Sequence, residues 1–142
     1  MTTKVVKSSS GGLTTWLLEA LLERGDIDGV VHVSASDSPL FMYTVSTTRD
    51  GLGARGKSRY YAVEVSEVLN AVRGNGRRYA FVGVPCFVKA ARLIAEQDEQ
   101  LGRQLVYFIG LVCGHLKSFA YAELMAWQQG VTPDKLERFD FR

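Results

Sequence analysis

Two cysteines, each placed directly after an apolar segment, are the best-defined candidates for chemistry in this sequence. Cys86 follows the segment 79–84, and Cys113 follows the segment 105–112. Both segments predict strands, and a helix expected over 85–96 crosses between them, so the two strands should be parallel and adjacent. Both thiols would then lie at the carboxyl edge of the sheet, where open α/β folds bind their ligands.

Three kinds of role are open to this pair of thiols. Two thiolates can ligate a metal, a dithiol can cycle with its disulfide, and free cysteines are also common as small buried residues. A four-thiolate iron–sulfur cluster needs four cysteines, and the chain has 2. The residues by themselves leave the three roles open.

A segment of small hydroxyl residues and glycines near the N-terminus is the second candidate. It directly precedes an apolar pattern of helical period over 13–24, and a helix N-terminus presents unpaired backbone N–H groups at its positive end. Glycine lets a phosphate approach the backbone, so the segment suits the phosphate of a nucleotide cofactor. The alternative is that Ser10 simply caps the helix. The candidate residues are Ser9, Ser10, Gly11, Gly12 and Thr15.

A glycine-rich basic stretch over 47–58 predicts a loop, and its end is the third candidate. Lys57 and Arg59 could balance an anionic group, Ser58 adds a hydroxyl, and Tyr60 could stack on a ring. The alternative is a solvated loop with one tyrosine packed into the core.

The elements that must position these residues alternate between strands and helices. Apolar segments predict strands over 28–34, 40–46, 79–84 and 105–112, and those over 28–34 and 105–112 are expected to be buried. Helical periodicity and stop signals predict helices over 13–24, 66–73, 85–96, 118–129 and 132–137, with Trp16 and Trp127 as packing residues. This order predicts an α/β fold with a mostly parallel sheet and helices on both faces.

Composition narrows the class of protein further. The chain has 142 residues, enough for one domain, and its 17 basic and 15 acidic residues give no nucleic-acid-binding signature. No apolar run approaches the about 20 residues that span a bilayer, and two cysteines cannot form a disulfide scaffold. We therefore expect a cytoplasmic protein without a membrane span. The strand-like end at 139–142 predicts a truncated fragment of a larger fold, or a partner that supplies the rest.

Several short motifs, taken in order, resemble those of the family of coenzyme F-420 hydrogenase/dehydrogenase beta subunits. They cover nearly the whole chain, and their order and spacing are more specific than any one of them. The matching pieces are Ser9-Ser-Gly-Gly12, Gly56-Lys-Ser-Arg-Tyr60, Phe81-Val-Gly-Val-Pro-Cys86, Ile109-Gly-Leu-Val-Cys-Gly114 and the tail 130–142.

The resemblance implies a flavin- and iron–sulfur-dependent oxidoreductase subunit that transfers electrons between FAD and a 4Fe–4S cluster. Ser10, Gly11, Gly12 and Thr15 would contact the flavin nucleotide together with Lys57, Ser58 and Tyr60, and Cys86 and Cys113 would be cluster ligands. The implied electron partner is coenzyme F-420, a partner protein such as a ferredoxin, or a small organic substrate, and a homo-oligomer is left open.

This chain also departs from the family pattern. It lacks the N-terminal ferredoxin-like cysteine run and the later Cys-x-x-Cys pair that would complete the cluster, and Phe87 stands where glutamine is common. We expect one α/β domain over 1–142, with the flavin-binding N-terminal domain at about 5–115 and the start of the C-terminal domain at 116–142. The rival functions are a thiol–disulfide redox protein that uses Cys86 and Cys113, and a non-catalytic assembly module.

Overall fold

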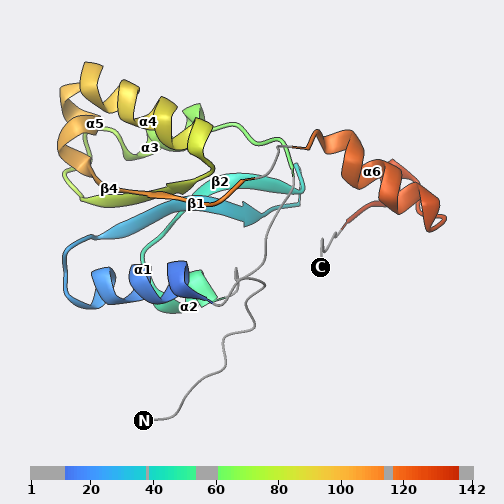
Figure 1. Ribbon diagram of the computed structural model, residues 1–142, viewed down its shortest axis with the longest axis horizontal. Helices are drawn as coiled ribbons and strands as arrows, with labels where there is room; N and C mark the ends of the chain where they lie inside the picture. The colour runs from blue at the N-terminus through green and yellow to red at the C-terminus, as the bar shows by residue number, and fades with distance from the viewer. Residues whose placement is uncertain (1–11, 38, 54–60, 114–116, 138–142) are drawn as a thin grey trace, which may run out of the picture.

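Four strands form one mixed sheet in a computed structural model that describes residues 12–37, 39–53, 61–113 and 117–137 (Figure 1). The strand order is β2-β1-β3-β4, with β1 at Gly29–Ala35, β2 at Phe41–Ser46, β3 at Tyr79–Gly83 and β4 at Leu105–Gly110. β3 pairs in parallel with both β1 and β4, whereas β2 is antiparallel to β1. The predicted mostly parallel sheet is confirmed.

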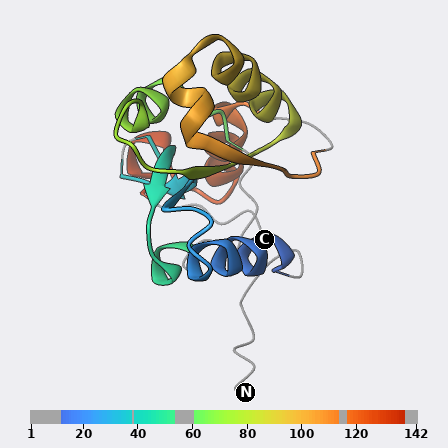
Figure 2. The same ribbon diagram turned by 90° about the vertical axis from the view of Figure 1, so that its left-hand side faces the viewer.

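Helices cover both faces of this sheet, as the alternation of elements predicted (Figure 2). The first layer holds α1 (Leu13–Glu23) and α2 (Arg49–Gly53), and the second holds α3 (Ser66–Val72), α4 (Pro85–Gln97) and α5 (Glu99–Gln104). α6 (Phe119–Gln128) and the short 3-10 turn Pro133–Lys135 follow β4 and lie beyond the strand ends in Figure 1.

The period of two along each strand divides the buried side chains between two cores. Val31 and Phe81 belong to the core beneath α3, α4 and α5. Val30, Ala80 and Val82 belong to the core beneath α1 and α2. Because β1 and β3 supply residues to both cores, these two strands are buried on both faces, as expected for the central strands of a parallel sheet.

Two helices were missed by the sequence patterns. α2 lies inside the stretch predicted as a loop, where Leu52 is buried and Arg49 pairs with Glu19 and Glu23 of α1. α5 follows α4 directly, and its N-cap Asp98 accepts hydrogen bonds from the backbone N–H groups of Gln100 (3.0 Å) and Leu101 (3.2 Å). Both helices are too short for hydrophobic periodicity to reveal them.

The expectation that β4 is a buried strand is wrong. β4 is an edge strand with Val106 and Tyr107 each 41% exposed, because β3 is its only partner among the described residues. The two tryptophans were also expected to pack, but Trp16 is 64% exposed and Trp127 is 68% exposed. Apolar residue type alone did not identify the surfaces that this chain leaves uncovered.

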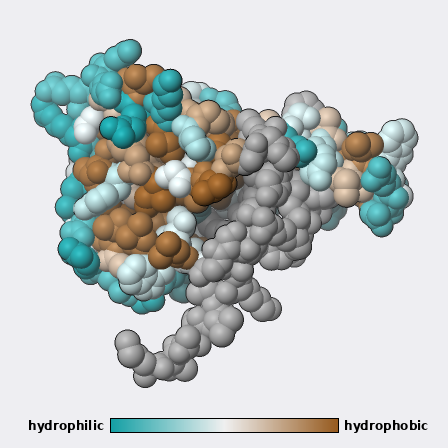
Figure 3. Space-filling model, in the orientation of Figure 1, coloured by the Kyte–Doolittle hydropathy of each residue, from teal (hydrophilic) through white to brown (hydrophobic). Residues whose placement is uncertain are grey.

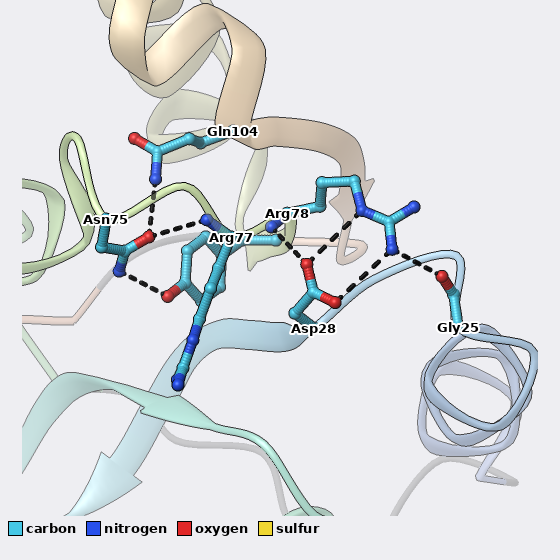
Figure 4. A network of polar contacts seen from close by, with 7 residues as sticks. Gly25, Asp28, Asn75, Arg77, Arg78 and Gln104 are labelled. Carbon is cyan, nitrogen blue, oxygen red and sulfur yellow. Dashed lines mark hydrogen bonds and ion pairs between the residues drawn. The ribbon is translucent and has the colours of Figure 1, made fainter.

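A polar network at the amino edge of the sheet joins α3, the following turn and α5 (Figure 4). The buried Gln104 amide donates to the carbonyl of Val72 (2.8 Å) and to Oδ1 of Asn75 (2.7 Å), and it accepts from the N–H of Gly74 (2.7 Å). Asn75 in turn donates to the hydroxyl of Tyr79 (2.7 Å). The network satisfies buried polar groups and fixes the start of β3, so we assign it a structural role.

Candidate functional site

The carboxyl edge of the parallel strands brings the two cysteines to the same side of the molecule. Gly83, the last residue of β3, pairs in register with Gly110, the last residue of β4. The N–H of Leu111 also donates to the carbonyl of Gly83 (2.8 Å). Each cysteine lies three residues beyond its glycine, so Cys86 and Cys113 leave adjacent strands at the same level. We call this edge the carboxyl rim.

The beginning of α1 points toward the same rim. The other end of α1 is held at the amino edge of the sheet, because Arg78 just before β3 donates to the carbonyl of Gly25 (2.7 Å) and pairs with Asp28. Eleven helical residues extend about 16 Å, so the helix returns beneath the sheet toward the rim. Figure 1 shows this direction, with the first turn of α1 on the side toward which β1 runs.

Gly12 occupies the N-cap position of α1 in the left-handed region, with φ 74°. Gly12 has no side chain that could cap the helix, and its carbonyl accepts a hydrogen bond from the N–H of Trp16 (2.9 Å). Among the described residues, the cap therefore supplies no side-chain acceptor to the first N–H groups, and Thr15 lies in the same turn. A glycine-led helix start has the donors and the positive dipole end that an anionic group requires.

A buried aromatic cluster lies next to the first turn of α4, which carries Cys86. The ring of Tyr43, on β2, stacks on Phe81 at 5.4 Å and lies 5.6 Å from the ring of Phe87. Burial raises the pKa of the Tyr43 phenol well above its ordinary value, and the charge of Cys86 raises it further. Tyr43 is therefore a neutral phenol next to the first turn of α4.

Gly83 makes the close approach of Tyr43 possible. A Cβ atom at Gly83 would lie 2.6 Å from the Tyr43 hydroxyl oxygen and 3.2 Å from the Cβ of Phe87. We expect Gly83→Ala to lower the free energy of unfolding by about 1–3 kcal/mol through this overpacking. Denaturant unfolding measures the loss, and adding Tyr43→Phe should recover part of it because the nearest clashing atom is removed. Strictly additive effects of the two substitutions would contradict this contact.

Among the predicted site residues, Cys86 and Cys113 follow adjacent strands at the carboxyl rim, and Gly12 and Thr15 lie at the start of α1, which points toward that side. The remaining predicted positions lie outside the described residues: Ser9, Ser10, Gly11, Lys57, Ser58, Arg59 and Tyr60. Sequence reasoning missed Tyr43, which looked like an ordinary strand aromatic. The strand over 40–46 was predicted, but nothing local showed which strand end Tyr43 would meet.

Both cysteines are free and exposed, so the interpretation that they are merely small buried residues is wrong. Their accessibility leaves ligation and thiol redox chemistry as the two roles that the rim can support. Within the described ranges, no group of three or more His, Cys, Asp or Glu side chains is arranged to hold a metal ion. The described residues thus offer two sulfur ligands and no completed metal site.

This combination defines an open α/β protein, and its carboxyl rim is the edge where such folds usually bind their ligands. Comparisons with known proteins agree on a family. Residues 1–70 match the family model for the N-terminal part of the coenzyme F420 hydrogenase/dehydrogenase beta subunit, and residues 76–142 match the model for its C terminus. The chain belongs to the family of coenzyme F420 hydrogenase/dehydrogenase beta subunits, as its motifs indicated.

Individual relatives support the same assignment. The chain is 31% identical over 106 residues to one of the subunits of the F(420)H(2) dehydrogenase of Methanosarcina mazei, covering 75% of this chain and 30% of that protein. It is 26% identical over 151 residues to the coenzyme F420-dependent sulfite reductase of Methanocaldococcus jannaschii, covering 96% of this chain and 24% of the relative.

A solved structure shares the fold. A chain of the F420-reducing [NiFe] hydrogenase complex from Methanosarcina barkeri superposes with a TM-score of 0.73 at 25% identity, covering 84% of this chain and 43% of that one. The present chain therefore spans between about a quarter and less than half of the proteins it matches. In the described ranges, no helix is both long and apolar enough to cross a membrane.

Proposed function

We propose that this chain is the flavin-binding part of an oxidoreductase subunit that transfers electrons between FAD and a 4Fe–4S cluster. The observation that carries the proposal is the carboxyl rim, where two accessible cysteines follow adjacent strands and toward which the glycine-led start of α1 points. A short separation between an organic cofactor and a cluster is what electron transfer between them requires.

The two sulfur atoms support the cluster half of the proposal. Iron–sulfur clusters are held by cysteine thiolates, and exposed thiols beside a helix N-terminus are suited to this role. Cys86 and Cys113 would supply two of the four ligands, and the other two would come from a different polypeptide segment. The bound cluster would supply one-electron chemistry, while the cysteines fix its position at the rim.

The start of α1 supports the flavin half. Gly12 and Thr15 would bind the cofactor phosphate through backbone and hydroxyl donors, and FAD would supply the two-electron chemistry. Ser9, Ser10, Gly11, Lys57, Ser58, Arg59 and Tyr60 stay predicted contacts of the same nucleotide. The names of the relatives favour coenzyme F-420 as an electron donor or acceptor and partner subunits as the redox partner. A ferredoxin stays the alternative partner that the family resemblance implies. A cytoplasmic location, where thiols stay reduced, belongs to the same proposal.

Titration of FAD with the purified chain tests the flavin half directly. We expect the flavin fluorescence to be quenched to a saturating value, because bound flavin lies against protein groups, and we expect anaerobic iron and sulfide to produce a broad brown absorption band. A chain that takes up neither FAD nor iron would favour the assembly module. Reversible disulfide formation between Cys86 and Cys113 without flavin uptake would favour the thiol redox protein instead.

A further inference from the structure

An exposed tryptophan lies one turn after the start of α1. Trp16 is 64% exposed, although tryptophan is among the side chains that gain most from burial. Leu13 is three residues earlier and therefore its neighbour on the helix surface, and it is 70% exposed. Figure 3 shows that apolar side chains gather over α1 on the face in view. The beginning of α1 thus presents an aromatic ring and an aliphatic side chain to solvent.

The indole of Trp16 lies next to the first N–H groups of α1. Side chains of an α-helix point back toward its N-terminus, so a residue covers the turn that precedes its own Cα atom. Trp16 is one turn beyond Gly12, whose carbonyl accepts a hydrogen bond from the N–H of Trp16 (2.9 Å). One turn advances the helix by only about 5.4 Å. The ring therefore borders the helix end at which the proposed function places a cofactor phosphate.

The charges around this helix end suit a phosphorylated ligand. The first turn of α1 contains no acidic residue. Glu19 and Glu23 lie on the same flank as Trp16, at helical spacing from it. Both carboxylates pair with Arg49 of α2, and the Glu19 contact is 3.1 Å long. The positive end of the helix dipole is therefore not opposed by an unpaired carboxylate of α1.

We propose that the indole of Trp16 stacks on a planar ring of the nucleotide whose phosphate binds at the start of α1. This inference rests on the proposed function and adds the residue that holds a ring of the cofactor. FAD has an adenine ring and an isoalloxazine ring, one on each side of its pyrophosphate. An aromatic side chain stacks on the face of either ring, and neither ring needs a hydrogen bond for this contact.

The second tryptophan of the chain shows why exposure alone does not define such a site. Trp127 is 68% exposed, but it lies in the last turn of α6. The carbonyl groups at that end give the negative pole of the helix dipole, which repels a phosphate. Trp127 therefore has the exposure of Trp16 without an adjacent anion site. Since the chain has 2 tryptophans, Trp127 is the matched control for Trp16.

Substitution of Trp16 in the full 142-residue chain tests the proposal, with FAD affinity measured by quenching of flavin fluorescence. Trp16→Ala should weaken FAD binding about tenfold, as loss of a stacking aromatic does for a nucleic-acid base. Trp16→Phe should bind FAD within about threefold of the unchanged chain, because a phenyl ring also stacks. Trp127→Ala should leave the affinity unchanged. The denaturation midpoint of Trp16→Ala should stay that of the unchanged chain, because the side chain is mostly exposed.

Fragments of FAD identify the ring that Trp16 contacts. FMN carries the isoalloxazine ring and ADP carries the adenine ring, and each retains a phosphate group. FMN binding is followed by its own fluorescence, and ADP binding by competition with FAD. Trp16→Ala should weaken the binding of ADP if adenine is the stacked ring, and of FMN if the isoalloxazine is; either result supports the proposal.

Two results would overturn the proposal, and they are distinguishable. If Trp16→Ala binds FAD, FMN and ADP as tightly as the unchanged chain does, the stacking role of Trp16 is wrong while the phosphate site at the start of α1 stands. If the unchanged chain shows no saturable binding of FAD, the proposed flavin function is wrong, and the stacking role is wrong with it.

Discussion

Replacing Cys86 by serine is expected to remove nearly all the iron and sulfide that the chain takes up under anaerobic reconstitution. The reconstitution contains a small exogenous thiol to occupy the two coordination positions that this chain does not supply. Serine keeps the size of the side chain and suits the first turn of α4, where Cys86 is exposed, so the fold should persist. The loss would come from the missing thiolate, and at least about a tenfold decrease in bound iron is expected because cluster ligation needs thiolate sulfur.

A displaced thiol provides the control for this prediction. The double variant Cys86→Ser, Ala90→Cys keeps two cysteines per chain but moves one of them a helical turn away from the rim. Iron uptake should stay low, and Cys113→Ser should lower it as strongly as Cys86→Ser does. Full iron content in the displaced-thiol variant would show that any exposed thiol binds iron adventitiously. The shared position of the two sulfurs at the rim would then be no evidence for cluster ligation.

Substituting Gly12 by valine is expected to weaken FAD binding at least about tenfold. Gly12 has φ 74°, a conformation that β-branched residues rarely adopt, so the substitution should shift the first turn of α1 and place a side chain where a phosphate would approach. Fluorescence quenching of FAD measures the affinity. The free energy of unfolding, measured in parallel, gives the cost of backbone strain.

Gly25 supplies a matched control at the other end of the same helix. It also has positive φ, at 70°, and a Cβ atom there would meet nothing within 4 Å. Gly25→Val should therefore impose a similar backbone strain while leaving FAD affinity unchanged. If Gly12→Val and Gly25→Val weaken FAD binding equally, helix stability rather than phosphate contact controls the affinity. If Gly12→Val binds FAD as tightly as the unchanged chain does, the start of α1 is not the phosphate site.

The position of the two cysteines was predictable from sequence because it depends on a topological rule. A strand, a crossover helix and a second strand are nearly always arranged as adjacent parallel neighbours, so residues that follow the two strands reach one edge. The observed pairing of Gly83 with Gly110 confirms this arrangement. The helix that begins at Pro85 was equally clear, because proline in the first turn is a local signal.

The role of Tyr43 could not be predicted in this way. Tyr43 lies on a strand that was predicted, but its contact with Gly83 joins residues forty positions apart. No local pattern encodes that Tyr43 of β2 reaches across β1 to the end of β3. The shift in the Tyr43 pKa follows from this long-range packing.

The sequence by itself determined the order and type of most elements, the α/β class and the family, because periodicity, turn residues and short motifs are local properties of a chain. Only the tertiary structure decided that β4 is an edge strand, that Trp16 is exposed, and that Tyr43 packs against Phe87 in the first turn of α4. Burial depends on which elements cover a residue, and an apolar run has the same sequence whether a neighbouring strand covers it or leaves it open.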